Sequence, residues 1–196
     1  SDRQFTIDMN GFYTLVNNAL SLDDFQLNGS DSVDYDGTMS RVTALVNKAE
    51  AYVYGTSAEA VAMFNEHFIL RSALTWTFGR IKTDTTDYPL DHVPPVFGRT
   101  GLQFRTKALE AEFYALYNGW KRLRDYNQLG EDNLQYATAE GMPAWCTLNV
   151  QASYAITRNF SVRAALENIG DVNYRTFASG ISAPGRNFSI ALRAAF

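Results

Sequence analysis

Apolar and polar residues alternate with a period of two along most of this chain, and this pattern constrains the fold more than any other feature. In the closing segment, Phe188, Ile190 and Leu192 fall on one series and Arg193 on the other. Successive side chains of a β-strand point to opposite faces of its sheet. The alternation therefore predicts strands with one apolar and one polar face.

Eight segments carry this pattern, and the connections between them alternate between long and short. The predicted strands span residues 3–16, 41–64, 68–82, 96–106, 109–120, 144–156, 160–167 and 187–196. The long connections span residues 17–40, 83–95, 121–142 and 170–185, and the short turns lie at 65–67, 106–108 and 157–159. The sequence therefore predicts an all-β fold, an antiparallel up-and-down meander with every long loop at one end. No linker divides the chain, so residues 1–196 are interpreted as one unit.

The segment 58–64 also has good helix formers, but its alternation continues from residues 51–55 without a helix cap, which favours a strand. Within the expected membrane spans, the charged residues of the predicted strands fall on the polar series: Asp8, Glu59, Arg71, Arg99, Arg105, Glu110, Glu112, Arg163, Glu167 and Arg193. A charge facing lipid near the bilayer midplane costs roughly 2–4 kcal/mol. The apolar series carries essentially no charge within the expected membrane spans, and this absence and the sorted loops favour transmembrane β-barrel strands over a soluble β-sandwich with solvated outer positions.

Composition excludes several other classes of protein. A net charge of −4 and a pI near 5.2 argue against a nucleic-acid partner. No apolar run approaches the roughly 20 residues of a membrane helix. Aromatic residues make up 14% of the chain, which suits both strands and the interfacial girdles of membrane barrels. The single cysteine, Cys146, forms no internal disulfide and falls on the apolar series.

The ending resembles that of TonB-dependent outer-membrane receptors. The residues that carry this resemblance are Asn168, Gly170, Asp171, Tyr174, Pro184, Gly185, Arg186 and the terminal Phe196. Weaker matches are PLDHVPPVFGRTGL at 89–102 and AYVYG at 51–55. The chain departs from the family at Ser57, where Glu is frequent, and at Ile169-Gly170, where Leu-Phe is common.

The resemblance implies the last third of a 22-stranded barrel in the cell outer membrane, with the amino-terminal plug domain absent from this chain. It implies energy-coupled uptake of a scarce small-molecule ligand, such as an iron-siderophore or haem. The implied partners are the lipid bilayer and lipopolysaccharide, the barrel assembly machinery, and the TonB complex acting through the missing plug. By the same analogy, Phe196 is the expected assembly signal.

Candidate ligand contacts are aromatic and cationic residues expected at upper lumen positions and in the long loops: Tyr35, Arg80, Lys82, Tyr88, His92, Arg122, Arg124, Tyr126, Tyr174 and Arg175. His67 and His92 have no metal-ligand spacing, so no metal site is predicted. No catalytic constellation and no cofactor site are evident, so an enzyme is not expected. Gly98-Arg99-Thr100-Gly101 lacks the lysine and the strand-to-helix context of a phosphate-binding loop.

Two other architectures fit the alternation. A self-contained eight-stranded membrane barrel would act as an anchor, an adhesin or a membrane enzyme, and its interior would be filled by side chains. A soluble barrel of lipocalin type would instead have an apolar interior. Small residues on the polar series, including Ala73, Gly79, Gly101 and Ala191, favour an interior with room for a plug.

Overall fold

The computed structural model describes residues 4–82, 87–128, 130 and 132–195. Its main sheet is an antiparallel meander in the order β1-β4-β5-β7-β8-β9-β10-β11. These strands are β1 (Gln4–Asp24), β4 (Thr43–Met63), β5 (Phe68–Lys82), β7 (Phe97–Arg105), β8 (Leu109–Asn118), β9 (Trp145–Ala155), β10 (Phe160–Glu167) and β11 (Asn187–Ala194). The described part of the chain includes no helix long and apolar enough to cross a membrane.

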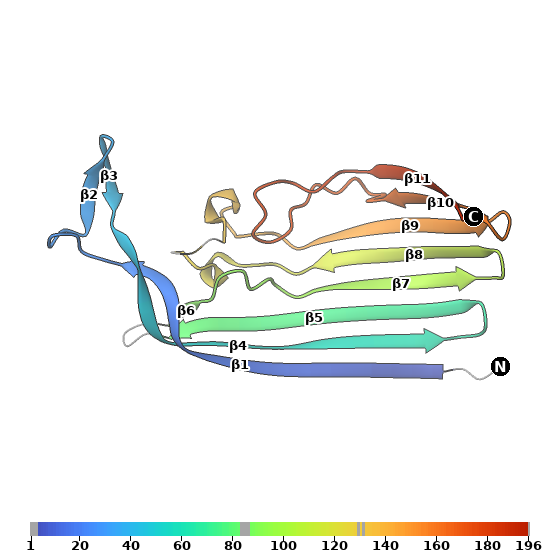
Figure 1. Ribbon diagram of the computed structural model, residues 1–196, viewed down its shortest axis with the longest axis horizontal. Coiled ribbons are helices and arrows are strands. Elements are labelled where there is room, and N and C mark those ends of the chain that lie inside the picture. The colour runs from blue at the N-terminus through green and yellow to red at the C-terminus, as the bar shows by residue number, and fades with distance from the viewer. Residues whose placement is uncertain (1–3, 83–86, 129, 131, 196) are drawn as a thin grey trace.

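The connections are sorted as predicted. Long connections lie at one end of the sheet, here called the loop end, and tight turns lie at the other, the turn end (Figure 1). The loops also contain short elements: a hairpin of β2 (Ser32–Tyr35) and β3 (Thr38–Arg41), the strand β6 (Asp87–Pro89), and the 3-10 helices η1 (Leu123–Asp125) and η2 (Leu134–Tyr136). β6 pairs with β5.

Two sequence-based expectations are wrong. Residues 17–24 were expected in a loop, but they continue β1 and pair with residues 43–50 of β4, because β4 supplies a long partner strand. The alternative of a closed eight-stranded barrel fails because β1 and β11 lie at opposite ends of an open sheet.

The register places every apolar series on one face of the sheet. Across the strands, Met9 lies opposite Ala58, Ala58 opposite Leu74, and Phe113 opposite Val150. Cys146 lies on this apolar face, opposite Tyr117, and is exposed as predicted. The opposite face, here called the polar face, carries the charged series.

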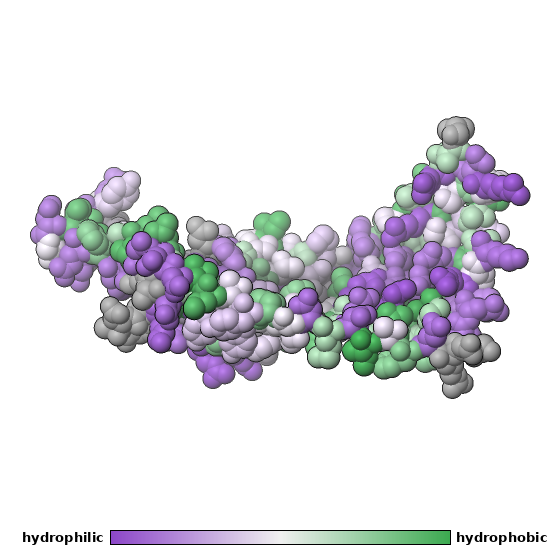
Figure 2. All heavy atoms as spheres, turned by 60° about the horizontal axis from the view of Figure 1, so that its bottom comes forward, coloured by the Kyte–Doolittle hydropathy of each residue, from purple (hydrophilic) through white to green (hydrophobic). Residues whose placement is uncertain are grey.

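Apolar side chains are exposed and polar side chains are buried, which is the reverse of the pattern in a soluble protein. Met9 and Ile190 on the apolar face are 75% and 62% exposed, whereas Thr147 and Asn149 on the polar face are almost fully buried. The molecule is trough-shaped, and hydrophilic residues gather on the hollowed side of its right-hand half (Figure 2). An uncovered apolar surface this extensive is typical of a face that contacts a membrane or another protein.

Polar groups on the apolar face satisfy one another. The Ser72 and Thr100 hydroxyls lie 2.8 Å apart, and the Thr100 hydroxyl lies 3.1 Å from the Tyr117 hydroxyl. Phe12, an apolar residue on the polar series, lies opposite Gly55, and its ring occupies the space that a Cβ of Gly55 would take. These contacts explain why Ser72 and Thr100 are tolerated on the apolar face and Phe12 on the polar series.

Two aromatic belts border the apolar face. The belt at the turn end contains Phe5, Phe64, Phe68, Phe104, Tyr154 and Phe160, and the belt at the loop end contains Tyr13, Tyr52, Tyr54, Trp76, Phe78 and Tyr117. Tyr54 contacts the rings of Trp76 and Phe78 at 5.7 and 5.3 Å. From Phe68 to Phe78, β5 rises about 33 Å, which at the tilt of barrel strands spans about 25 Å of height. That height matches the apolar band of a membrane barrel.

Candidate ligand-binding site

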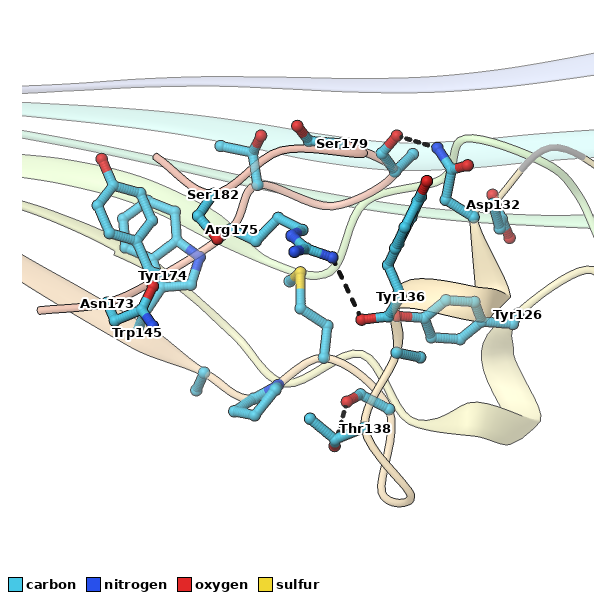
Figure 3. Close-up of a pocket in the computed structure, with 18 of the residues that line it drawn as sticks. Tyr126, Asp132, Tyr136, Thr138, Trp145, Asn173, Tyr174, Arg175, Ser179 and Ser182 are labelled. Carbon is cyan, nitrogen blue, oxygen red and sulfur yellow. Dashed lines mark hydrogen bonds between the residues drawn. The ribbon is translucent and has the colours of Figure 1, made fainter. Parts of the chain in front are cut away.

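A cavity of about 310 Å³ lies at the loop end, between the loop of residues 119–144 and the loop of residues 168–186. Trp145, the first residue of β9, belongs to the same series as Thr147 and Asn149, so its ring lies on the polar-face side. The residues that line the cavity include Tyr126, Asp132, Tyr136, Thr138, Trp145, Asn173, Tyr174, Arg175, Ser179 and Ser182 (Figure 3). The site is therefore at the mouth of the trough.

Aromatic rings and one guanidinium dominate the cavity. The Trp145 and Tyr174 rings pack with centroids 4.2 Å apart. The Arg175 guanidinium lies 5.1 Å from the centroid of the Tyr136 ring and donates a hydrogen bond to the Tyr136 carbonyl at 3.4 Å (Figure 3). The indole N–H of Trp145 is buried and has no hydrogen-bond partner among the described residues. A buried N–H group without a hydrogen-bond partner favours a ligand that carries an acceptor oxygen.

A buried carboxylate joins the loops around the cavity. Asp132 is 2% exposed, and its carboxylate accepts hydrogen bonds from the backbone N–H groups of His92 at 2.8 Å and Asn127 at 2.9 Å. Because His92 and Asn127 belong to different long loops, Asp132 holds those loops together. Two charge-assisted hydrogen bonds make this a strong contact.

Lys121 lies beneath this region in a buried position. Its Nζ donates a hydrogen bond to the Val93 carbonyl at 2.6 Å and lies 4.7 Å from the Phe177 ring centroid. Burial lowers the pKa of the Lys121 ammonium, although Asp132 and Asp125 oppose the shift. Burial also raises the pKa of the Tyr126 hydroxyl, and the charge of Asp132 adds to that increase.

These two shifts predict the pH dependence of loop stability. A lysine whose pKa is lowered by folding destabilises the folded loops while it is charged, so we expect their stability to rise as pH increases from that lowered pKa toward the ordinary lysine value of 10.5. The raised pKa of Tyr126 acts in the opposite direction above its ordinary value of 10.0, because the unfolded chain ionises first. Proteolysis rates of the 121–142 loop, measured from pH 7 upward, should fall and then rise. In the Lys121→Met variant the initial fall should be absent.

The loop of residues 168–186 is anchored by a polar cluster around Asn168. The Asn168 side chain donates hydrogen bonds to the Val172 carbonyl at 2.9 Å and the Pro184 carbonyl at 3.3 Å, and it accepts one from the Val172 N–H at 2.9 Å. The Asn168 N–H donates to the side-chain oxygen of Asn149 at 2.8 Å. Asn168 is 3% exposed and has a left-handed φ of 49°, which asparagine tolerates well. This cluster positions Tyr174 and Arg175.

A charged network crosses the middle of the polar face. Arg99 pairs with Glu112 at 2.8 Å, Gln151 donates a hydrogen bond to the same carboxylate at 2.7 Å, and Arg163 donates one to Gln151. Gly101 makes room for Glu112, since a Cβ at position 101 would lie 2.5 Å from the Glu112 carboxylate. Leu90 and Val93 fill the corresponding space at Gly79. At both glycines, neighbouring side chains therefore occupy the space that a Cβ would take.

The structure brings together three of the predicted contacts, Tyr126, Tyr174 and Arg175. Arg122 and Arg124 lie in the same loop as Tyr126, at and within η1, and Arg124 is 85% exposed. His92 reaches the site through its backbone. Tyr126, Tyr174 and Arg175 are thus the predicted contacts that line the cavity, whereas Arg122, Arg124 and the His92 side chain do not line it.

The other predicted contacts lie elsewhere. Arg80 lies opposite Tyr52 on the apolar series, with its guanidinium 3.9 Å from the Asp87 carboxylate, and Lys82 is on the same series. Tyr88 lies in β6 opposite Ile81, and Tyr35 is 75% exposed at the end of β2. Phe196, the predicted assembly signal, lies outside the described residues.

Sequence reasoning missed Asp132, Tyr136 and Trp145. Trp145 has a local signal, because its series in the predicted strand 144–156 places a large aromatic residue on the polar face. Asp132 and Tyr136 have none, since their positions depend on contacts between loops. Among the described residues, no group of three or more His, Cys, Asp or Glu side chains is arranged to hold a metal ion.

Comparison with known proteins gives consistent matches. The profile of the TonB dependent receptor-like, beta-barrel family matches residues 1–169. Lactoferrin-binding protein A of Neisseria meningitidis serogroup B is 30% identical over 132 residues, which cover 56% of this chain and 14% of that protein.

Solved structures share the fold. The copper transporter OprC superposes with a TM-score of 0.77 and 18% identity, over 98% of this chain and 29% of that one. The ferric enterobactin receptor of Pseudomonas aeruginosa gives a TM-score of 0.68 and 16% identity, over 97% of this chain and 29% of that one. The chain thus spans less than a third of the length of each of these proteins.

Proposed function

Because this chain belongs to the TonB-dependent receptor β-barrel family, we propose that it forms part of the wall of an outer-membrane receptor that takes up a scarce ligand. Homologues of this chain are receptors and transporters, and the barrels of this family are outer-membrane proteins. The proposed ligand is an iron-siderophore or haem. Ferric enterobactin and copper, named for two proteins of the same fold, support a metal-containing cargo.

The two faces of the sheet support this placement. The apolar face and its aromatic belts meet the lipid, and the polar face lines the lumen of a closed barrel completed by further strands, 22 in all. The loop end then lies outside the cell and the turn end in the periplasm. Energy from the TonB complex, transmitted through a plug domain, would release the ligand into the lumen. Lipopolysaccharide and the barrel assembly machinery are partners of the same proposal.

The cavity at the loop end is the observation that carries the proposal for ligand binding. It lies on the lumen side, at the outer mouth, where a ligand would arrive first. Its Arg175 guanidinium and the unpaired N–H of Trp145 suit an anionic, oxygen-rich group, and its aromatic rings suit a planar one. A cavity of about 310 Å³ accommodates one arm of a chelate rather than a whole siderophore.

The test uses the full-length receptor in detergent, titrated with a panel of ferric siderophores and haem. For the ligand that binds, we expect Arg175→Gln to weaken affinity about tenfold, or about 1.4 kcal/mol, because a charge-assisted contact is lost. Trp145→Phe, which keeps a ring and removes the N–H, should weaken it about threefold to tenfold.

The matched control is Arg124→Gln, because Arg124 is exposed and does not line the cavity. This control should bind as tightly as the natural receptor. Equal affinities for the Arg175 and Arg124 variants would show that the cavity does not contact the ligand. Binding of no member of the panel would instead reject the proposed ligand class.

A further inference from the structure

A two-stranded arm extends from the loop end, separate from the cavity. It consists of residues 17–50: the outer parts of β1 and β4, which pair from Asn17 opposite Glu50 to Asp24 opposite Thr43, and the β2–β3 hairpin beyond them. The paired part alone extends about 23 Å along the strands. Figure 1 shows the hairpin projecting away from the rest of the sheet.

The arm exposes large apolar side chains that the membrane does not cover. Tyr35, Leu20 and Met39 are 75%, 72% and 70% exposed. Phe25, Leu27 and Leu45 are also exposed on the arm. All six lie beyond the loop-end aromatic belt, so on the proposed placement in the membrane they face water. Aromatic residues and methionine are enriched where proteins contact one another.

The negative net charge of the chain is concentrated in the arm. Residues 17–50 contain six acidic and two basic residues, a net charge of −4, which equals the net charge of all 196 residues. The rest of the chain is therefore neutral. Within the arm, Arg41 forms an ion pair with Asp24, which leaves the acidic character of the hairpin at Asp31, Asp34 and Asp36.

We propose that this arm is a docking surface for a protein with a basic, partly apolar face. The exposed apolar side chains supply the contact area, and the excess of carboxylates selects the sign of the partner's charge. A phosphate-bearing lipid surface would repel the arm. A bound cation has no support, because no described cluster of acidic side chains is arranged to hold one. The proposal rests on the arm lying outside the cell, but it is independent of the ligand in the cavity.

The first test measures binding of lysozyme, a small basic protein, to the full-length receptor in detergent at low salt, with succinylated lysozyme as an acidic control. We expect lysozyme alone to bind. The triple variant Asp31→Asn, Asp34→Asn and Asp36→Asn should bind at least about tenfold more weakly, because the attraction is electrostatic. A variant with three neutralised acids elsewhere at the loop end, Asp87→Asn, Asp125→Asn and Glu140→Gln, should stay within about twofold of the natural receptor.

The second test examines the apolar contribution. At physiological salt, the double variant Met39→Ser and Leu45→Ser should bind lysozyme at least about threefold more weakly. Hydroxyl-radical footprinting of the receptor without lysozyme should oxidise Met39 readily. Equal weakening in both triple variants, no effect of the apolar double variant, or protection of Met39 in the free receptor would each overturn the proposal. None of these results depends on binding in the cavity, so failure here leaves the proposed function standing.

Discussion

Replacement of Asn168 by alanine is expected to loosen the loop of residues 168–186 and to weaken ligand binding, although Asn168 does not line the cavity. Alanine loses three side-chain hydrogen bonds to Val172 and Pro184 and places a less tolerant residue at a left-handed φ. The combined cost is about 3 kcal/mol. The loop would then release Tyr174 and Arg175 from the positions that form the cavity.

Limited proteolysis of the full-length receptor measures this effect directly. Cleavage between residues 170 and 186 should accelerate in Asn168→Ala, and affinity for the ligand should fall with it. Asn187→Ala is the matched control, since the Asn187 side chain is exposed and donates one hydrogen bond, to Glu167 at 3.2 Å. We expect that control to cleave at the natural rate. An intact, protease-resistant loop in Asn168→Ala would refute the anchoring role.

Replacement of Glu112 by alanine is expected to destabilise the strands of the polar face by about 2–3 kcal/mol. The substitution removes the only carboxylate paired with Arg99 among the described residues and one hydrogen-bond partner of Gln151. Glu112 is nearly buried, whereas Arg99 is 37% exposed, so water recovers part of the lost interaction. The cost therefore falls below that of breaking a fully buried pair.

The loss of stability should appear as a lower unfolding temperature. Unfolding is measured by the change in the mobility of the receptor on gels. Glu59→Ala is the control, because Glu59 lies 4.0 Å from Arg71 and is 55% exposed, and its effect should stay below about 0.5 kcal/mol. The double variant Glu112→Ala with Arg99→Met should be more stable than Glu112→Ala alone, because no unpaired charge remains. Equal stability of the two would show that an unpaired Arg99 carries no penalty.

The strands and their faces could be predicted from sequence because alternation is a local property of the backbone. Met9, Phe113 and Ile190 lie on the face that their series assigns them. The exceptions need a partner strand to be understood: Phe12 breaks its series because Gly55 lies opposite. The polarity of residues 17–24 predicts a loop and masks their pairing with residues 43–50.

The site was only partly predictable, because it forms between loops distant in the sequence. Tyr126, Tyr174 and Arg175 are aromatic and cationic loop residues, which made them candidates, but nothing local distinguishes them from Tyr35 or Tyr88. The residues that resemble the family ending have a structural explanation. The Asp171 carboxylate accepts a hydrogen bond from the Arg186 N–H at 2.8 Å, and the Arg186 side chain donates to the Ile169 carbonyl at 3.0 Å.

The doubly bonded carboxylate of Asp132 has a mechanical consequence. It joins the backbone at His92 to the backbone at Asn127, and the neighbouring Asn133 side chain donates to the Ala178 carbonyl at 2.6 Å. Three long loops are thereby cross-braced at a single point. We therefore expect a displacement of any one of these loops by an arriving ligand to be shared by the other two.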